Sequence, residues 1–357
     1  MNEYSHLYCY ILNTFMSRGI YNLGNTCFLN TCLQILLHSY ELHTLPLEIC
    51  NTTIVEAKFV EQWILLLKEM IPENENEQIK EPFSPNAMIA WVQHIAKLQN
   101  RMLFTGNSQN DMTEFLLFFM DCFHTCFQRS IDTQIRGQIE NETDNMAVEC
   151  YKMIADTYKK EYSEIRELFY GISVSKLIDV KDTSRVLHLK PESFFILDLP
   201  IDGPNIYTCL QKYTTPELLE KENAWFNEKT GLKQDVYKQI VFWNFPPILV
   251  ISLNRFYIDI EHNCLLKNMH LVDFPIDTLD LSSFVQGYHS STFQYELYGV
   301  CNHIGDIMGG HYSAFVKTYK NEWFHCNDHI IEKVENIQHI ITPMAYCLFY
   351  RKKNNSL

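Results

Sequence analysis

A cysteine at the end of a loop rich in glycine and asparagine is the first residue whose surroundings suit chemistry. The segment from Gly19 to Asn30 reads GIYNLGNTCFLN, and a helical pattern of apolar residues begins at Cys27. Backbone N–H groups at a helix N-terminus stabilise a thiolate, so this placement predicts a lowered pKa and a nucleophilic sulfur. Cys27 is therefore a candidate nucleophile, and a buried core cysteine is the alternative.

The same loop carries groups that can hold a developing negative charge. Asn22 and Asn25 supply side-chain amides, and the glycines of the loop let backbone N–H groups approach a reacting carbonyl. Donors of this kind form an oxyanion hole. The loop and the cysteine together favour acyl transfer through a covalent thioester.

A thiol nucleophile also needs a base, and one of the 14 histidines lies in a setting that suits this role. Gly309 and Gly310 precede His311, which begins a predicted strand, and the segment WFHCND ends at Asn327 and Asp328. A hairpin of two strands would return Asn327 or Asp328 to the imidazole ring. That side chain would accept the ring N–H and fix the tautomer. A histidine with only a packing role is the alternative.

The elements that must position these residues follow two successive patterns. Apolar residues at helical spacing predict helices over about 27–38, 54–71, 84–98, 111–127 and 142–169. Ser84 is expected to cap the third of these helices, with Pro85 in its first turn. Strands are predicted over 172–177, 194–199, 247–256, 293–302, 311–319, 322–326 and 345–350, and residues 204–235 show no clear pattern. Helices followed by antiparallel strands predict an α+β fold.

Several of these segments resemble the ubiquitin-specific protease family. The cysteine segment, followed by Leu33 and Gln34, resembles the family's cysteine box. The segment GGHYSAF from Gly309, followed by Trp323 and Asn327-Asp328, resembles its histidine box. Weaker landmarks between them are QNDMTEFL at 109–116, the strand at 247–256 and the strand at 345–350. The resemblance covers about residues 19–350, nearly the whole chain.

The resemblance implies a papain-like cysteine protease fold with a helical thumb, a β-rich palm and reduced fingers. It implies a short arm over 1–18, a catalytic domain over 19–351 and a tail over 352–357. Within the domain, it implies a thumb over about 19–170, fingers over about 171–245 and a palm over about 246–351.

The resemblance also implies an activity, that of a thiol-dependent deubiquitinase. Such an enzyme hydrolyses thioester, peptide or isopeptide bonds after the C-terminal glycine of ubiquitin, so the implied partners are ubiquitin and ubiquitinated proteins. By position, Cys27 matches the nucleophile, His311 the base and Asn22 the oxyanion-hole residue. Asn327 matches the third member of the triad, and Asp328 matches a neighbouring acid that shares or replaces that role.

Three further residues are expected to face the substrate. Asp111 and Glu114 match acids that hold the arginines of the ubiquitin tail, and Gln34 lies in the matched cysteine box. Independently of the resemblance, carboxylates at positions i and i+3 share one face of a helix and suit a basic, extended tail. The alternative for Asp111 is that it only caps its helix.

We expect neither a metal nor a cofactor. Many family members bind zinc in the fingers through two C-x-x-C pairs, whereas residues 171–245 contain only Cys209. Cys122, His124 and Cys126 lie close together in the sequence, but their helix is apolar, which favours core packing over a metal site.

Composition narrows the range of partners. The net charge is −14, with 43 acidic against 29 basic residues, which argues against nucleic-acid binding. No apolar run is long enough to span a bilayer, and no signal peptide is evident, so we expect no membrane association. The 12 cysteines form no C-x-x-C pair and predict reduced thiols inside the cell. We expect a cytoplasmic or nuclear protein that acts as a monomer.

Two other functions remain open. One is a protease for a ubiquitin-like modifier, and the other is a catalytically silent protein that only binds ubiquitin. A silent relative would be expected to have lost the cysteine or the histidine, and both are present.

Overall fold

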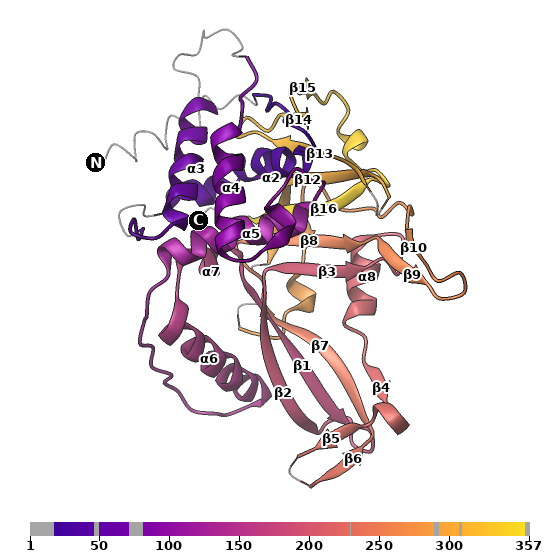
Figure 1. Ribbon diagram of the computed structural model, residues 1–357. Coiled ribbons are helices and arrows are strands. Elements are labelled where there is room, and N and C mark those ends of the chain that lie inside the picture. The colour runs from indigo at the N-terminus through magenta and orange to yellow at the C-terminus, as the bar shows by residue number, and fades with distance from the viewer. Residues whose placement is uncertain are drawn as a thin grey trace.

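The chain folds into a group of helices beside a large sheet, with a second long sheet extending away from both (Figure 1). The computed structural model describes residues 18–45, 50–70, 81–228, 230–288, 293–306 and 309–353. The arm predicted over 1–18 and the tail predicted over 352–357 therefore lie almost entirely outside the described residues. The predicted α+β fold class is confirmed.

The helices come first along the chain, as the apolar periodicity predicted. The α-helices are α2 (Cys27–Leu37), α3 (Glu56–Met70), α4 (Asn86–Leu98), α5 (Met112–Phe127), α6 (Glu142–Glu161), α7 (Glu164–Phe169) and α8 (Ile206–Tyr213). The single helix predicted over 142–169 is divided into two helices, because Tyr162 and Ser163 have an extended backbone conformation.

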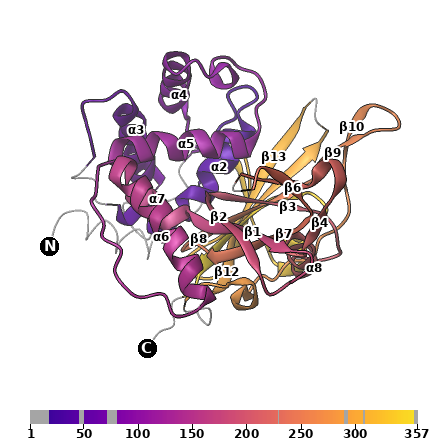
Figure 2. The same ribbon diagram turned by 90° about the horizontal axis from the view of Figure 1, so that it is seen from below.

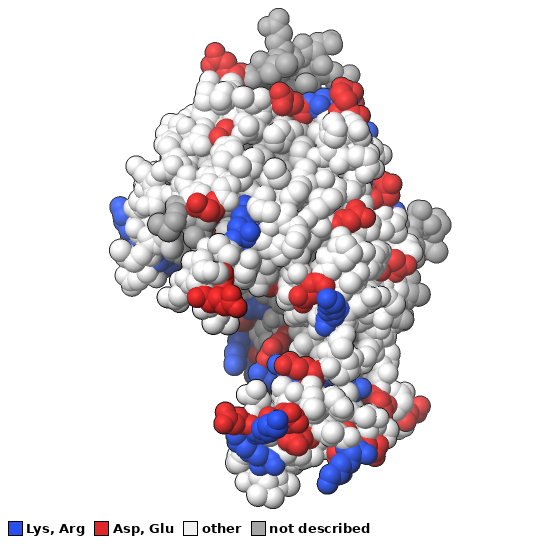
Figure 3. Space-filling view, turned by 90° about the vertical axis from the view of Figure 1, so that its right-hand side faces the viewer, with Lys and Arg blue, Asp and Glu red and all other residues white. Residues whose placement is uncertain are grey.

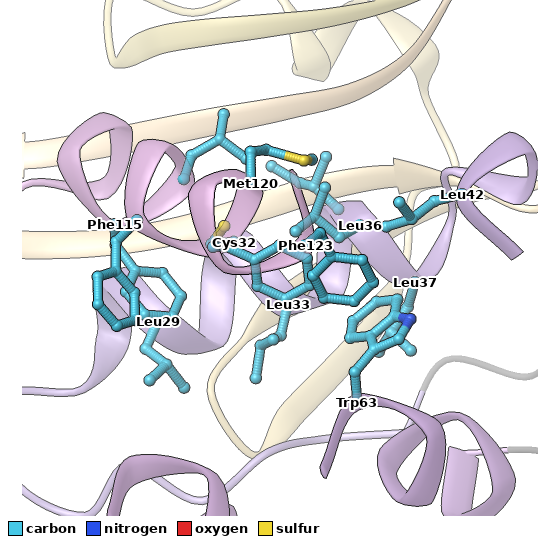
Figure 4. Close-up of a cluster of buried hydrophobic side chains, with 14 of the residues drawn as sticks. Leu29, Cys32, Leu33, Leu36, Leu37, Leu42, Trp63, Phe115, Met120 and Phe123 are labelled. Carbon is cyan, nitrogen blue, oxygen red and sulfur yellow. The ribbon is translucent and has the colours of Figure 1, made fainter. Parts of the chain in front are cut away.

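Helix α2 lies at the centre of the molecule, between α5 and the sheet strand β13 (Gly310–Lys317) (Figure 2). All of its residues are buried, the polar Asn30, Thr31 and Gln34 among them, and the remaining residues are apolar. Figure 4 shows how Leu29, Leu33 and Leu36 of α2 meet the aromatic rings of the neighbouring helices. A helix held on all sides fixes the position of its first residue, Cys27.

The start of α5 agrees with the sequence, and the start of α4 does not. The Asp111 side chain caps α5 by accepting hydrogen bonds from the backbone N–H groups of Thr113 and Glu114. Helix α4 begins at Asn86, one residue after its N-cap Pro85, so the predicted cap at Ser84 is wrong. The Ser84 hydroxyl is instead occupied by the Asn86 side chain, which donates to it over 2.8 Å.

The large sheet carries the segments with the histidine box. Its strand order is β15-β14-β13-β12-β16-β8-β3, with β11 also paired to β12. Its members are β3 (Ile196–Pro200), β8 (Ile248–Asn254), β11 (Leu279–Asp280), β12 (Gln294–Gly305), β13, β14 (Trp323–Asn327), β15 (Ile330–Lys333) and β16 (Ala345–Lys352). Only the pairing of β3 with β8 is parallel.

Strands β13 and β14 form the predicted hairpin. Their register pairs Ala314 with Cys326 and Lys317 with Trp323, so the two strands are antiparallel. The end of β14 therefore returns to the beginning of β13. This brings Asn327 to the same end of the hairpin as His311.

The extended second sheet has the order β2-β1-β7-β4, and α6 packs against it. Its strands are β1 (Gly171–Asp179), β2 (Val186–Phe194), β4 (Glu217–Leu219) and β7 (Val236–Asn244). Two hairpins complete the fold, β5 (Trp225–Asn227) with β6 (Leu232–Gln234) and β9 (Phe256–Asp259) with β10 (Cys264–Lys267). The strand predicted over 194–199 is divided, since Phe194 ends β2 and β3 begins at Ile196.

Two histidines beside the helices make the fold sensitive to acid. Burial lowers the pKa of His38 to about 4 and that of His43 to about 3. Above about pH 6.5, both rings are neutral in the folded and the unfolded chain. Below that pH, the unfolded chain binds protons that the folded chain does not, so the free energy of unfolding falls.

We therefore expect each buried histidine to cost about 2 kcal/mol of stability when the pH is lowered from 7 to 5. Urea unfolding at both pH values measures this loss. The variant His43→Leu should lose less stability over that interval than the parent, whereas His339→Ala, at an exposed position, should behave like the parent. An equal loss in His43→Leu and the parent would contradict the assignment.

Candidate active site

The Cys27 thiol is buried against the strand that carries the histidine box. Cys27 begins α2, and 3% of its surface is exposed. Burial raises the pKa of the thiol, and the Asp328 carboxylate adds to this rise, against hydrogen bonds from the backbone of Tyr312, Phe28 and Cys27. The predicted lowering of the pKa is thus wrong, because desolvation outweighs the helix N-terminus. A pKa raised in this way favours the neutral thiol in the free protein.

His311 precedes Tyr312, whose backbone contacts the Cys27 thiol, and its imidazole ring is hydrogen-bonded to Asn327. Its Nε2 is 2.6 Å from the Asn327 Oδ1, which accepts the ring N–H. Among the described residues, Nδ1 of the ring makes no hydrogen bond, and the thiol and the imidazole are not directly bonded. Because the thiol touches the backbone of Tyr312, the next residue along β13, the nitrogen left free is the one available to the sulfur.

Asp328 does not bind the His311 ring, which the sequence had allowed, and lies instead beside the loop before Cys27. Its backbone has a positive φ of 51°, which turns the carboxylate away from the direction of Asn327. Its Oδ1 accepts a hydrogen bond of 2.8 Å from the Asn30 side chain, and its Oδ2 accepts one of 3.0 Å from the Asn22 side chain. Asn327 is thus the partner of the His311 ring, and Asp328 anchors the loop before Cys27.

Of the two asparagines in that loop, only Asn22 is held at the helix start. Its Oδ1 accepts hydrogen bonds of 3.1 Å from the backbone N–H groups of Gly24 and Thr26, while its Nδ2 donates to Asp328. An amide nitrogen carries two hydrogens, so one remains for an oxyanion. The Asn25 side chain instead donates to the Asn107 carbonyl over 3.0 Å. Its amide is therefore bonded to the neighbouring loop.

Asp111 is bound within the protein on both of its oxygens. Its Oδ1 caps α5, and its Oδ2 accepts hydrogen bonds from the hydroxyls of Tyr312 at 2.9 Å and Tyr346 at 2.8 Å. The carboxylate thus ties the first turn of α5 to the large sheet. This favours the capping alternative over a direct contact with substrate arginines. Glu114, one turn along the helix, is exposed.

Gln34 does not reach the surface of the site. It is 2% exposed, and its side-chain amide donates to the Arg18 carbonyl over 2.7 Å. Its place on the buried α2 makes it a support for the chain that precedes the cysteine loop. This buried position contradicts the prediction that Gln34 faces the substrate.

Three residues that build the site were given no role from the sequence. Asn30 is buried at 1% exposure and holds Asp328, while Tyr312 and Tyr346 hold Asp111. A detectable signal existed for Asn30, since a buried asparagine on an otherwise apolar helix must find a hydrogen-bond partner. The tyrosines gave no such signal.

No group of three metal-binding side chains occurs in the part of the chain that the structure describes. Cys122 and Cys126 belong to the buried core of α5, and His124 lies 2.6 Å from the Ser163 hydroxyl. Helices among the described residues also lack the length and apolar character that crossing a bilayer requires.

Charges are unevenly spread over the face shown in Figure 3. Acidic and basic side chains crowd together at its lower end, over the tip of the extended sheet, and the broad region above is mostly uncharged. The two signs are mixed, so this face offers no continuous basic track for a phosphate backbone.

Comparison with known proteins identifies similar sequences that match nearly the whole chain. A family model described as ubiquitin carboxyl-terminal hydrolase matches residues 18–350. The chain is 26% identical over 347 residues to ubiquitin carboxyl-terminal hydrolase Usp2 of Drosophila melanogaster, covering 94% of this chain and 34% of that protein. It is 28% identical to ubiquitin carboxyl-terminal hydrolase 2 of Bos taurus, covering 93% of this chain and 54% of that protein. The chain thus spans about a third to a half of these relatives.

Solved structures agree with the fold. The chain is similar to the SAGA Ubp8/Sgf11/Sus1/Sgf73 DUB module bound to ubiquitin aldehyde, with a TM-score of 0.72 and 21% sequence identity. The match covers 96% of this chain and 71% of that chain. At this identity, the likeness supports the fold.

Proposed function

This chain belongs to the ubiquitin carboxyl-terminal hydrolase family, and on that premise we propose that it is a deubiquitinating cysteine protease. Its proposed reaction is hydrolysis of the thioester, peptide or isopeptide bond that follows the C-terminal glycine of ubiquitin. Its proposed partners are ubiquitin and ubiquitinated proteins, which it meets as a monomer inside the cell.

One observation carries the proposal. A thiol at residue 27 lies against the backbone of residue 312, and the imidazole of residue 311 is held by the Asn327 amide at 2.6 Å. These groups come from opposite ends of the chain. Their juxtaposition has the parts of a cysteine-protease triad: a sulfur, a base with one nitrogen free, and a residue that fixes the other nitrogen.

The first half of the proposed reaction begins from a neutral thiol. The Cys27 sulfur attacks the carbonyl carbon of the terminal glycine while the His311 Nδ1 takes the thiol proton. The carbonyl oxygen becomes an oxyanion, for which the free amide hydrogen of Asn22 and backbone N–H groups at the start of α2 are the proposed donors. Asp328 supports this role because it holds the Asn22 amide.

The second half releases the two products. The tetrahedral intermediate collapses, the bond to nitrogen breaks, and the imidazolium of His311 gives its proton to the leaving amine. A thioester then joins Cys27 to ubiquitin. Water attacks this thioester with His311 as the base, which frees the ubiquitin carboxylate and restores the thiol.

Parallel assays with C-terminal fluorogenic derivatives of ubiquitin and of ubiquitin-like modifiers test the proposal. We expect release from the ubiquitin derivative at the highest kcat/KM, because the matched family is that of ubiquitin hydrolases and Glu114, which the resemblance assigns to the basic ubiquitin tail, is exposed. Faster release from the derivative of a ubiquitin-like modifier would identify that modifier as the preferred substrate in place of ubiquitin. Ubiquitin binding without release from any derivative would identify a silent binding protein.

A further inference from the structure

We propose that Gln109 is a positioning residue that holds the His311 strand in register with the Cys27 thiol, an inference that rests on the proposed function. Its side chain bonds to both backbone groups of Gly310, which immediately precedes His311. The Gly310 N–H donates to the Gln109 Oε1 over 2.9 Å, and the Gln109 Nε2 donates to the Gly310 carbonyl over 3.0 Å. One amide thus joins the loop before α5 to the first residue of β13 as a clamp.

Each of the two glycines before His311 lies where a side chain would collide with a different neighbour. A Cβ at position 309 would lie 2.6 Å from the Gln109 Oε1, so a side chain there would displace the amide. A Cβ at position 310 would collide with the His303 ring and the Ile304 carbonyl on β12. The absence of a side chain at Gly309 leaves space for the Gln109 amide, and its absence at Gly310 lets β13 pack against β12.

The clamp is fixed at its other end as well. The loop that carries Gln109 is joined to the cysteine loop by the hydrogen bond from Asn25 to the Asn107 carbonyl at 3.0 Å. The same loop leads into α5, whose cap Asp111 binds the Tyr312 hydroxyl at 2.9 Å. The residues on both sides of His311 are therefore bonded to the segment that leads into α5.

This arrangement assigns different tasks to three side chains. Asn327 fixes the orientation of the imidazole ring, Asp111 fixes the residue after it, and Gln109 fixes the backbone before it. The Gln109 bonds lie at an exposed position, so their loss should leave the buried core in place. A displacement of about 1 Å between reacting groups can cost about 10²-fold in rate. Loss of the clamp should therefore affect the chemical step.

We expect Gln109→Ala to lower kcat about 10- to 100-fold on a ubiquitin substrate while KM changes less than about threefold. Ser108→Ala is the matched control, since that exposed side chain lies on the same loop, and it should keep the parent kcat. Thermal unfolding of each variant checks that the fold is intact.

Gln109→Glu separates the hydrogen bonds from packing. A carboxylate has nearly the same size and accepts from the Gly310 N–H, but it has no hydrogen to donate to the Gly310 carbonyl. The carboxyl group is ionised between pH 6 and 8, so kcat of this variant should stay below that of the parent across this range. If the side chain only filled space, Gln109→Glu would keep the parental kcat.

A double-mutant cycle with Gly309→Ala completes the test. Gly309→Ala should lower kcat in the parent and add little to Gln109→Ala, because both changes break the same clamp. Cleavage by the parent with unchanged kcat in Gln109→Ala, or an effect on KM alone, would overturn the inference and leave the proposed function standing. Failure of the parent chain to cleave any ubiquitin substrate would overturn both.

Discussion

Cys27→Ala is expected to lower kcat/KM for ubiquitin substrates by at least about 10⁴-fold, because it removes the sulfur that forms the proposed thioester. The change deletes one buried sulfur at the first position of α2, and the helix keeps its other contacts. Ubiquitin binding should therefore persist. Single-turnover cleavage of a ubiquitin substrate measures the first effect, and calorimetric titration with ubiquitin measures the second.

The control for this substitution is Cys264→Ala, which removes an exposed thiol on β10 and should retain parental cleavage. Cleavage within tenfold of the parent by folded Cys27→Ala would exclude this residue as the nucleophile. Loss of cleavage in Cys264→Ala instead would place the reactive sulfur on β10.

His311→Ala is expected to lower kcat by about 10³- to 10⁴-fold with a smaller change in KM. The neutral thiol explains the size of this effect. Burial raises the pKa of Cys27, so the sulfur depends on a base to remove its proton during attack. Without the ring, the residual rate should increase with pH as hydroxide generates more thiolate, and steady-state kinetics between pH 6 and 9 measure this response.

His339→Ala is the matched control, because that histidine is exposed in the short η7 helix (Ile337–Ile340). It should leave both kcat and the pH profile unchanged. A His311→Ala variant that retains the parental kcat at neutral pH would show that another group accepts the thiol proton.

The order of elements could be predicted because it depends on local patterns. Helices α2, α3 and α5 follow apolar residues at helical spacing, and Asp111 signals the start of α5. The region over 204–235 could not be assigned, since its strands β4, β5 and β6 each have three residues, too few to show alternation.

The site divides in the same way between local and long-range information. Cys27, His311 and Asn327 were accessible because each lies in a short, specific segment. The pKa of Cys27 was predicted in the wrong direction because burial by β13 outweighs the local helix N-terminus. The clamp from Gln109 to Gly310 joins positions 201 residues apart, so no local pattern announces it.

Asp328 illustrates how backbone conformation decides between neighbouring residues. Asn327 and Asp328 are equally placed by sequence to meet the imidazole. The left-handed backbone at Asp328, with a φ of 51°, directs its carboxylate to Asn22 and Asn30, and the ring is left to Asn327. Such a turn is uncommon for a residue other than glycine, although aspartate adopts it more readily than most.

The most direct measurement is reaction of the whole chain with ubiquitin that carries a thiol-reactive group in place of its C-terminal carboxylate, followed by intact mass and peptide mapping. We expect one adduct, on the peptide that contains Cys27, and none in Cys27→Ala. A folded chain that gives no adduct, or whose adduct maps to another of its 12 cysteines, would contradict it.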